Sequence, residues 1–232
     1  MPRVGIWGRG VDKQRFHPSK RSEELRAQWA PNGEVVVGYM GRLAAEKRVQ
    51  DMAVLADIPG VKLVIVGHGP DRDQLEKQIP GAIFTGGLGG EDLPRAVASM
   101  DVFCSTGELE TFCQAVQEAK ACGVPVISPR RGGPIDLIDP SRTGWLYEPG
   151  NMDEFRSYVV DLVGDGYKRR AMGTAARASI EDRTWGHLCA ELVGHYEEAI
   201  RIGSVAAPAR HRLLSAATHH SLSLIHISEP TR

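Results

Sequence analysis

Two glutamates mark the stretch of this sequence that is best suited to chemistry. Glu110 and Glu118 lie eight positions apart in the segment GELETFCQAVQEAKACGVPV, residues 107–126. The pattern predicts a helix that begins around Phe112 or Cys113, so Glu110 lies in the loop before it and Glu118 more than one turn inside it. A carboxylate among alanines is costly without a partner. Hydroxyl groups of a bound ligand would provide one. The alternatives are an internal salt bridge and a solvated helix face.

The start of the same predicted helix offers hydrogen-bond donors. The first backbone N–H groups of a helix have no partner inside it, and here they belong to Phe112, Cys113 and Gln114. Such donors suit a phosphate oxygen or sugar hydroxyls, because they lie at the positive end of the helix dipole. We therefore expect Glu110 and these N–H groups to face one ligand. A reactive thiol at Cys113 is an alternative use of the same position.

Two cations follow the predicted buried strand EVVVGYM. Arg42 and Lys47 belong to the segment GRLAAEK, residues 41–47, at the start of a further predicted helix. Gly41 permits a sharp turn between the strand and these residues. Two positive side chains beside a helix N-terminus form a site suited to phosphate. The alternative is an exposed loop in which Lys47 is solvated.

A glycine-containing turn follows the next predicted strand. Gly67 and Gly69 in the segment VGHGPDRDQLE bring the backbone close to another group, but their spacing is not the Gly-x-Gly-x-x-Gly pattern of a dinucleotide site. Asp71 and Asp73 spell an Asp-x-Asp that holds a metal in some enzymes. In the first turn of a helix predicted to start at Pro70, they are better interpreted as partners of the helix dipole. We therefore predict no metal site.

Apolar runs and helical patterns alternate over residues 34–147. Continuous β-branched runs are typical of strands that are buried on both faces. The predicted strands are 34–40, 61–67, 82–84, 101–105, 125–128 and 144–148, and the predicted helices are 45–58, 70–78, 91–100, the helix after Glu110, 151–163, 166–180 and 184–201. This alternation predicts an α/β fold, with a Rossmann-like, mostly parallel sheet, helices on both faces and further helices at the C-terminus. Ligands bind such sheets beyond the carboxyl ends of the strands, where the segments described above are expected to lie.

The composition narrows the possible partners and the compartment. The 232 residues are 42% hydrophobic and 25% charged, which is ordinary for a soluble globular protein. A net charge of −1 favours neither nucleic acid nor an anionic membrane as a partner. The cysteines lack the paired short spacings of zinc ligands, so they predict reduced thiols in a cytoplasmic protein. They are Cys104, Cys113, Cys122 and Cys189.

Both ends of the sequence predict segments outside the main fold. Residues 1–18, with a predicted strand at 3–7, are expected to be an interdomain strand and linker from a missing N-terminal domain, so that the chain is a fragment. Residues 203–232 are small, polar and basic, and are expected to be a disordered tail. Residues 222–232, LSLIHISEPTR, resemble the translation of a transposase sequencing adapter. The alternative is a natural tail.

Taken together, the segments resemble the C-terminal, donor-binding domain of family 4 glycosyltransferases, which have the GT-B fold. The resemblance covers about residues 3–200, and its pieces keep the order that they have in the family. They are GRLAAEK, VIVGHGP, FTGGLGGEDLPRAVASMDVF, ELETFCQAVQEAKACGVPVIS, RRGGPIDLI and TGWLYEPG. The most specific piece has two glutamates with seven residues between them and an Ala-Cys-Gly-x-Pro-Val continuation. The resemblance implies a donor-binding domain over residues 19–182 and a C-terminal crossover helix over residues 183–202.

The resemblance also implies catalytic roles for three residues. Arg42 and Lys47 would neutralise the diphosphate of a nucleotide sugar and stabilise it as a leaving group. Glu110 would contact hydroxyls of the transferred sugar, helped by the main chain around the start of the following helix. Many members have glycine where Cys113 stands. A side chain there is expected to narrow the space beside the sugar and to tune the choice of donor.

The remaining candidate residues would bind the donor. Glu118 would hold the ribose hydroxyls, and the loop from Gly86 to Leu88 would lie against the base. The full donor-binding set is Gly41, Gly67, Gly86, Leu88, Thr111, Phe112, Cys113, Gln114 and Glu118.

The implied function is that of a retaining glycosyltransferase that needs no metal or cofactor and takes a nucleotide sugar, GDP-mannose, as co-substrate. The segments GELETFCQAVQEA and WGRGVD are most similar to actinobacterial GDP-mannose-dependent α-mannosyltransferases that build membrane glycolipids. A lipid or glycan acceptor would bind the missing N-terminal domain, which would also make any contact with the inner membrane face, so the chain alone is expected to be inactive. The alternatives are a UDP-sugar transferase (glucosyl or sulfoquinovosyl), a GT-B-like UDP-sugar epimerase and a non-catalytic nucleotide-sugar binding module.

Overall fold

The computed structural model describes residues 7–206 of the 232-residue chain. By its internal contacts the chain divides into one unit that ends at Glu191 and a second that begins at Leu192. The expectations for residues 1–6 and 207–232 lie outside the described residues. Against expectation, residues 203–206 are not part of a disordered tail, because helix α8 spans Trp185–Ala206. Within the described residues, no helix combines the length and apolar character that crossing a membrane requires.

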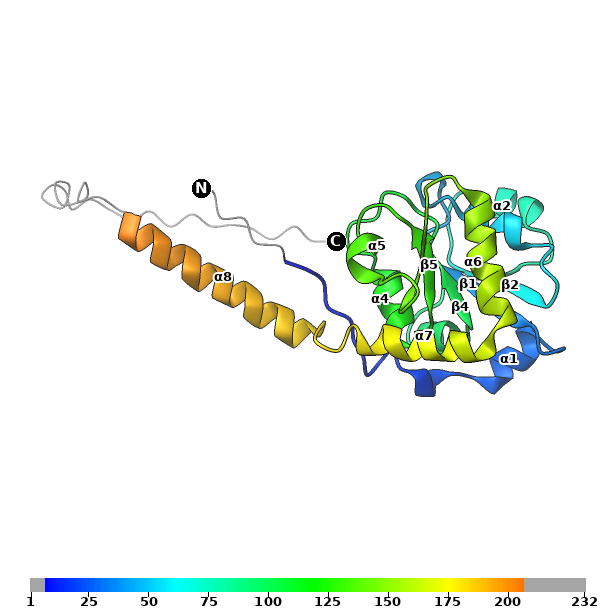
Figure 1. The fold of residues 1–232 in the computed structure, drawn as a ribbon, viewed down its shortest axis with the longest axis horizontal. Coiled ribbons are helices and arrows are strands. Elements are labelled where there is room, and N and C mark those ends of the chain that lie inside the picture. The colour runs from blue at the N-terminus through cyan, green and yellow to red at the C-terminus, as the bar shows by residue number, and fades with distance from the viewer. Residues whose placement is uncertain (1–6, 207–232) are drawn as a thin grey trace, which may run out of the picture. The chain divides into compact units, whose positions relative to one another are not determined.

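Six parallel strands form a single sheet in the order β3–β2–β1–β4–β5–β6 (Figure 1). The strands are β1 Val35–Met40, β2 Val61–Val66, β3 Ile83–Gly86, β4 Val102–Cys104, β5 Val126–Pro129 and β6 Gly144–Tyr147. Each lies within about two residues of its predicted range at either end. The strand order reverses between β1 and β4, because the chain adds strands first on one side of β1 and then on the other. The parallel sheet confirms the predicted fold class.

The remaining helices connect the strands or follow the sheet. The α-helices are α1 Glu23–Trp29, α2 Arg72–Gln78, α3 Asp92–Ala98, α4 Gln114–Ala121, α5 Pro134–Leu137, α6 Met152–Gly164 and α7 Gly166–Ala178, and the 3-10 helices are η1 Pro18–Lys20, η2 Ala45–Lys47 and η3 Val49–Leu55. The helices α1 and α5 had not been predicted.

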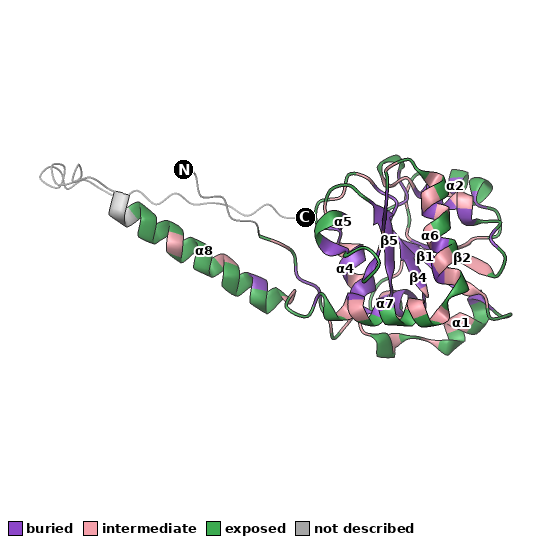
Figure 2. Ribbon diagram, viewed as in Figure 1, coloured by how far each residue is buried: buried purple, intermediate pink, exposed green. Residues whose placement is uncertain are grey.

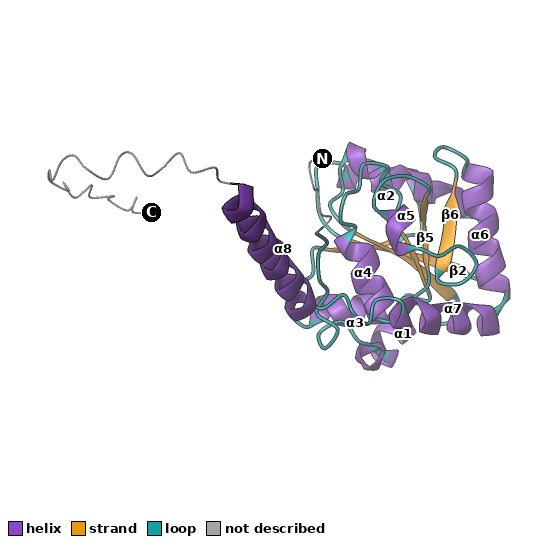
Figure 3. Ribbon diagram, turned by 60° about the vertical axis from the view of Figure 1, so that its left-hand side comes forward, coloured by secondary structure: helices purple, strands orange, loops and turns teal. Residues whose placement is uncertain are grey.

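Helices cover both faces of the sheet, as Figure 3 shows for α4 and α5 on one side and α6 on the other. Alternate residues of a strand point into two separate hydrophobic clusters. In β1, Val36 and Met40 pack with residues of α1, α3 and α4, whereas Val37 and Tyr39 pack with residues of η3, α2 and α6. Figure 2 shows the buried strands between helices whose outer sides are exposed. Because both faces of the strands are buried, their sequences are continuous apolar runs, which made them easy to predict.

The prediction of one helix over residues 45–58 is wrong, because the structure has two 3-10 helices, η2 and η3, in this segment. Arg48 separates η2 from η3 in the left-handed conformation, with φ of 50°. A side chain in that conformation interrupts a right-handed helix, even though Met52 and Leu55 keep the apolar spacing and are fully buried. The helix N-terminus expected beside Arg42 and Lys47 is therefore a single 3-10 turn, which has little dipole to offer an anion.

Two other helices begin later than predicted. The helix α2 starts at Arg72 and not at Pro70, and Asp71 occupies its N-cap position without a side-chain capping bond. The helix α4 starts at Gln114 and not at Phe112 or Cys113. Cys113 precedes it in the left-handed conformation, with φ of 47°, and so cannot be its first helical residue.

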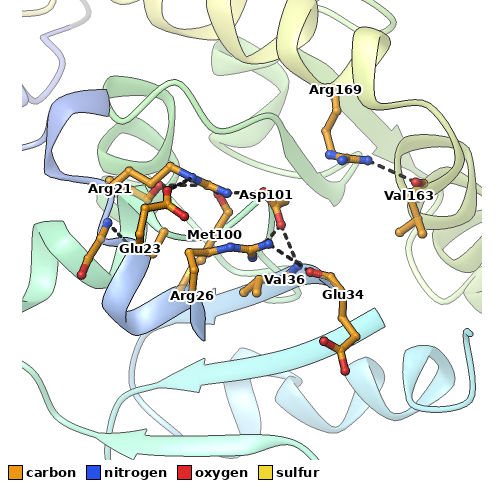
Figure 4. Close-up of polar contacts among 12 residues, drawn as sticks. Arg21, Glu23, Arg26, Glu34, Val36, Met100, Asp101, Val163 and Arg169 are labelled. Carbon is orange, nitrogen blue, oxygen red and sulfur yellow. Dashed lines mark hydrogen bonds and ion pairs between the residues drawn. The ribbon is translucent and has the colours of Figure 1, made fainter. Parts of the chain in front are cut away.

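The amino-terminal edge of the sheet is held by a carboxylate between arginines (Figure 4). Asp101 lies 2.9 Å from Arg21 and 2.7 Å from Arg26, and it accepts a hydrogen bond of 2.8 Å from the backbone N–H of Val36. Nearby, Arg169 donates to carbonyl oxygens at the C-terminal end of α6. Cations are favourable where helix carbonyls lack partners, so this arginine-rich edge has a structural explanation.

Candidate functional site

The carboxyl ends of β1 and β4 meet where the strand order reverses. In open parallel sheets, this switch point is the crevice in which ligands bind. The loop after β1 carries residues 41–47 and the loop after β4 carries residues 105–113, while Gly67 follows β2 and residues 86–88 end and follow β3. The fold therefore brings the predicted site segments to one edge of the sheet.

A cavity of about 550 Å³ opens beside the carboxyl ends of β1 and β2. Four of the predicted site residues line it, namely Gly41, Arg42, Gly67 and Leu88. Gly87 also lines it, within the loop predicted to lie against the base. The lining residues that the prediction did not include are Met40, Val66, His68, Gly69, Pro70 and Leu93. Their largely apolar walls suit a flat ring system that makes a few polar contacts with the main chain.

Close backbone contacts shape one wall of this cavity. The N–H of Gly67 donates to the carbonyl of Gly86 at 2.9 Å, and the N–H of Gly41 donates to the carbonyl of Val66 at 3.0 Å. Gly67 has φ of 148°, and a Cβ atom there would overlap the carbonyl oxygen of Gly41. Glycine alone meets both requirements. Gly86 supports the wall through its hydrogen bond to Gly67 and does not itself line the cavity.

Lys47 and Glu110, which are 63 residues apart in the sequence, form an ion pair. The Nζ atom of Lys47 lies 2.6 Å from Oε1 of Glu110, and their side chains are 28% and 19% exposed. The hydroxyl of Thr106 donates to the carbonyl of Lys47 at 2.7 Å and ties the loop after β4 to η2. Arg42 is more exposed and lies 3.8 Å from the carboxylate of Glu46. Because both cations face carboxylates at the surface, an arriving phosphate can compete for them.

The loop that carries Glu110 rests on the glycine pair at 132–133. The N–H of Gly133 donates to the carbonyl of Glu110 at 2.8 Å. A Cβ atom at Gly133 would overlap the carbonyl oxygen of Thr111, and one at Gly132 would lie 2.5 Å from that of Glu110. Both positions therefore require glycine. The segment RRGGPIDLI contributed to the family resemblance, but only this close approach shows what its glycines do.

The side chain of Cys113 points into the protein interior. It is 5% exposed and packs in the cluster that contains α3 and α4. Burial raises the pKa of its thiol to about 12, and the Glu110 carboxylate adds to this effect. These observations argue against a reactive thiol and against a side chain that narrows the space beside a sugar. The left-handed backbone is the conformation that glycine adopts freely, which explains the glycine that the resemblance leads one to expect there.

Glu118 is partly buried on α4, and no described residue lies within ion-pair distance of its carboxylate. Burial raises the pKa of its carboxyl to about 7, against the opposing effects of the Arg15 charge and the Gln114 side chain. The Oε1 atom of Gln114 is also buried and accepts no hydrogen bond from any described residue. Gln114 and Glu118 are one turn apart on the same side of α4. A ligand with two hydroxyl groups would donate to both acceptors, whereas the alternative of an internal salt bridge is not formed among residues 7–206.

Other predicted residues lie around these two groups in different environments. Thr111 and Phe112 are exposed on the loop before α4, and the guanidinium of Arg9 lies 5.1 Å from the ring centroid of Phe112. Arg15 donates to the carbonyl of Gly90 at 3.0 Å, so the loop after β3 is joined to the side of α4 that carries Glu118. In the part of the chain that the structure describes, no three His, Cys, Asp or Glu side chains gather as metal ligands would.

Comparison with known proteins assigns the family. The family model described as glycosyl transferases group 1 matches residues 21–179. The chain belongs to this family. The match covers all six strands of the sheet and both glutamates, and it confirms the family resemblance inferred from the sequence.

Two curated relatives of this chain come from Mycolicibacterium smegmatis. The chain is 50% identical over 208 residues to a GDP-mannose-dependent alpha-mannosyltransferase, covering 89% of this chain and 55% of the relative. It is 32% identical over 214 residues to a GDP-mannose-dependent alpha-(1-6)-phosphatidylinositol monomannoside mannosyltransferase, covering 82% of this chain and 56% of the relative. The chain thus spans about half the length of these relatives.

Solved structures of glycosyltransferases share the fold of this group 1 domain. The crystal structure of Anabaena HepE in complex with UDP superposes with a TM-score of 0.74 at 25% sequence identity, covering 82% of this chain and 56% of that chain. The likeness agrees with the Rossmann-like sheet of GT-B glycosyltransferases that the sequence predicted.

Proposed function

We propose that the protein is a retaining glycosyltransferase with GDP-mannose as its donor, and that the described unit binds this donor. One observation carries the proposal. At the switch point of the sheet, a lysine–glutamate pair stands before a helix that carries two acceptors on one side. Oε1 of Gln114 is buried without a donor among the described residues, and the carboxylate of Glu118 is partly buried without an ion-pair partner among them. A ligand with both phosphates and hydroxyl groups meets these requirements together, because phosphates attract the cation and hydroxyls donate to the acceptors.

The proposed arrangement assigns each part of the donor to a described feature. The base occupies the apolar cavity between Gly41 and Leu88. The ribose hydroxyls donate to Glu118 and the neighbouring Gln114. The sugar lies against Glu110, against Thr111 and against the main-chain N–H groups of Phe112, Cys113 and Gln114. Its identity as mannose is supported by the name of the relative that is 50% identical.

The cations Arg42 and Lys47 are proposed to carry the electrostatic part of the reaction. The bond between the anomeric carbon and the diphosphate oxygen breaks, and the acceptor oxygen bonds to that carbon on the same face. The acceptor hydroxyl proton leaves with the diphosphate. The negative charge that develops on the diphosphate is stabilised by the guanidinium group of Arg42 and the ammonium group of Lys47. The proposal therefore requires no metal ion, because these two cations stabilise the charge of the leaving diphosphate, as a metal ion does in other enzymes.

The acceptor in this proposal is a lipid or a glycan. A lipid is supported by the second relative, whose name includes a phosphatidylinositol mannoside. A cytoplasmic location is supported by the four cysteines, which are all free thiols, as is typical of a reducing compartment. Any membrane contact and the acceptor site are assigned to parts of the protein other than the described unit.

Isothermal titration of the chain with GDP-mannose, GDP, UDP-glucose and UDP tests the donor. We expect GDP-mannose and GDP to bind and the uridine nucleotides to bind more weakly. If UDP-glucose binds more tightly than GDP-mannose, the assigned donor is wrong and the donor carries a uridine nucleotide. Failure of all four ligands to bind would refute the proposed function.

Variants of the cations sharpen the test. Arg42→Ala and Lys47→Met are each expected to weaken GDP binding by about tenfold or more, because a charge-assisted hydrogen bond contributes about 1.5–3 kcal/mol. Arg142→Ala is a matched control, since Arg142 is 76% exposed and pairs only weakly with Asp139. Equal GDP affinity in Arg42→Ala, Lys47→Met and the control would contradict the assigned phosphate site.

A further inference from the structure

Lys120 is a buried cation that the proposed reaction does not use. The side chain lies on α4, two residues after Glu118, and is 1% exposed. No described carboxylate forms an ion pair with it, and burial lowers the pKa of its amine to about 8. Burying an ammonium group is costly, and an unbranched apolar side chain in its place would avoid the cost. The amine is therefore expected to do something that packing alone does not.

The amine makes one hydrogen bond among the described residues, to the carbonyl oxygen of Leu137. Leu137 is the last residue of α5, a single helical turn. The carbonyl groups at the end of a helix lack partners within it, and a lysine is a favourable partner for them. Lys120 thus fastens the C-terminal end of α5 to α4.

The other end of α5 touches the loop that carries Glu110. Its N-cap residue is Gly133, whose N–H donates to the carbonyl of Glu110 at 2.8 Å. Gly133 also packs so closely on the main chain of Thr111 that a Cβ atom would not fit. Since α5 is only four residues long, a shift at Leu137 reaches Gly133 within one turn.

We propose that Lys120 is a positioning residue that sets the placement of Glu110 and Thr111 by fixing α5 between α4 and their loop. The inference rests on the proposed function, in which Glu110 and Thr111 contact the sugar of the donor. Lys120 itself touches no part of the donor. Replacing Lys120 therefore weakens the contacts of Glu110 and Thr111 with the sugar, while the contacts with the base, the ribose and the diphosphate persist.

The test compares Lys120→Met with Lys77→Met by isothermal titration with GDP and with GDP-mannose. Lys77 is exposed on α2 and serves as the matched control. In Lys120→Met we expect the affinity for GDP-mannose to fall about fivefold to tenfold, which corresponds to the loss of about one hydrogen bond. The affinity for GDP is expected to stay within about twofold, because GDP lacks the sugar that Glu110 and Thr111 contact. General loosening of the fold would instead lower the affinities for both ligands together.

The pH dependence of the unmodified chain supplies a second measurement. The charged groups that face the amine are Asp139 and Arg183, of which Arg183 lowers and Asp139 raises its pKa, and Asp136 lines the same small cavity. Above about pH 8 the amine becomes neutral and its bond to Leu137 weakens. The ratio of GDP-mannose to GDP affinity should therefore fall from about pH 7 to about pH 9 in the unmodified chain and in Lys77→Met, but not in Lys120→Met.

Titration of Glu118 does not disturb this comparison, because its contact with ribose is common to both ligands and cancels in the ratio. A ratio in Lys120→Met that equals that of the control at every pH would overturn the inference while leaving the proposed function intact. A ratio in the unmodified chain that does not change with pH would overturn it as well, even if Lys120→Met failed to fold. Binding of neither ligand by the unmodified chain would overturn the proposed function and the inference with it.

Discussion

Replacing Glu118 with glutamine is expected to stabilise the chain at neutral and alkaline pH while weakening its binding of a nucleotide sugar. The reason is the partly buried carboxyl group on α4, which has no cation beside it in ion-pair contact among the described residues. Glutamine keeps the size of the side chain and removes the charge. A residue that serves the fold would be expected to destabilise it when replaced, whereas a residue that serves a ligand can have the opposite effect.

The magnitude follows from the pKa of the carboxyl group. Burial raises it from 4.5 to about 7 in the folded chain. Each pKa unit corresponds to about 1.4 kcal/mol, so full ionisation in the folded state costs up to about 3 kcal/mol relative to the unfolded state. Water reaches part of this carboxylate and screens it, so we expect a gain of about 1–2 kcal/mol for Glu118→Gln at about pH 8.

The sign of the pH dependence is also defined. Between about pH 4.5 and pH 7 the unfolded chain has lost the proton that the folded chain still holds, so the contribution of Glu118 to stability falls as the pH rises and is constant above about pH 7. Urea unfolding of the unmodified chain, Glu118→Gln and the exposed control Asp153→Asn at about pH 5 and pH 8 isolates this contribution.

We expect Glu118→Gln to exceed the unmodified chain in stability at the higher pH only, and to bind GDP about tenfold or more weakly, because a hydrogen bond to a charged acceptor is lost. Equal or lower stability of Glu118→Gln at about pH 8 would refute the reasoning about the uncompensated charge. Unchanged GDP affinity would refute the assignment of the ribose site.

Three further outcomes test the fold and the site. Asp101→Asn is expected to lower the free energy of unfolding by about 3 kcal/mol, as measured in urea, because it leaves two arginines without their carboxylate. Gly67→Ala is expected to destabilise the chain and abolish GDP binding in calorimetry, since the added methyl group displaces the main chain at the cavity wall. A thiol reagent followed by mass spectrometry is expected to modify Cys189, which is exposed, and not Cys113 until the chain is unfolded. Modification of Cys113 in the folded chain would contradict its burial.

The sequence by itself determined the strands, the fold class and the segments that supply the site. Residues 35–40 and 61–66 are buried on both faces, so their apolar runs are continuous and carry a local signature. Chemistry-bearing residues such as Arg42 directly follow such runs. In a parallel sheet the carboxyl ends of the strands lie at one edge, so their convergence could be inferred without coordinates.

Only the tertiary structure decided which of these residues touch and what supports them. The pairing of Lys47 with Glu110 depends on β1 and β4 being neighbours, and no local pattern encodes the order of strands. Arg48 and Cys113 adopt left-handed conformations, which the helical spacing of the residues around them does not reveal. The contact between Gly133 and the loop of Glu110 likewise joins segments whose sequences carry no sign of each other. The spacing of apolar residues shows which side of one segment packs against the core. A binding site depends on contacts between several segments, which that spacing does not encode.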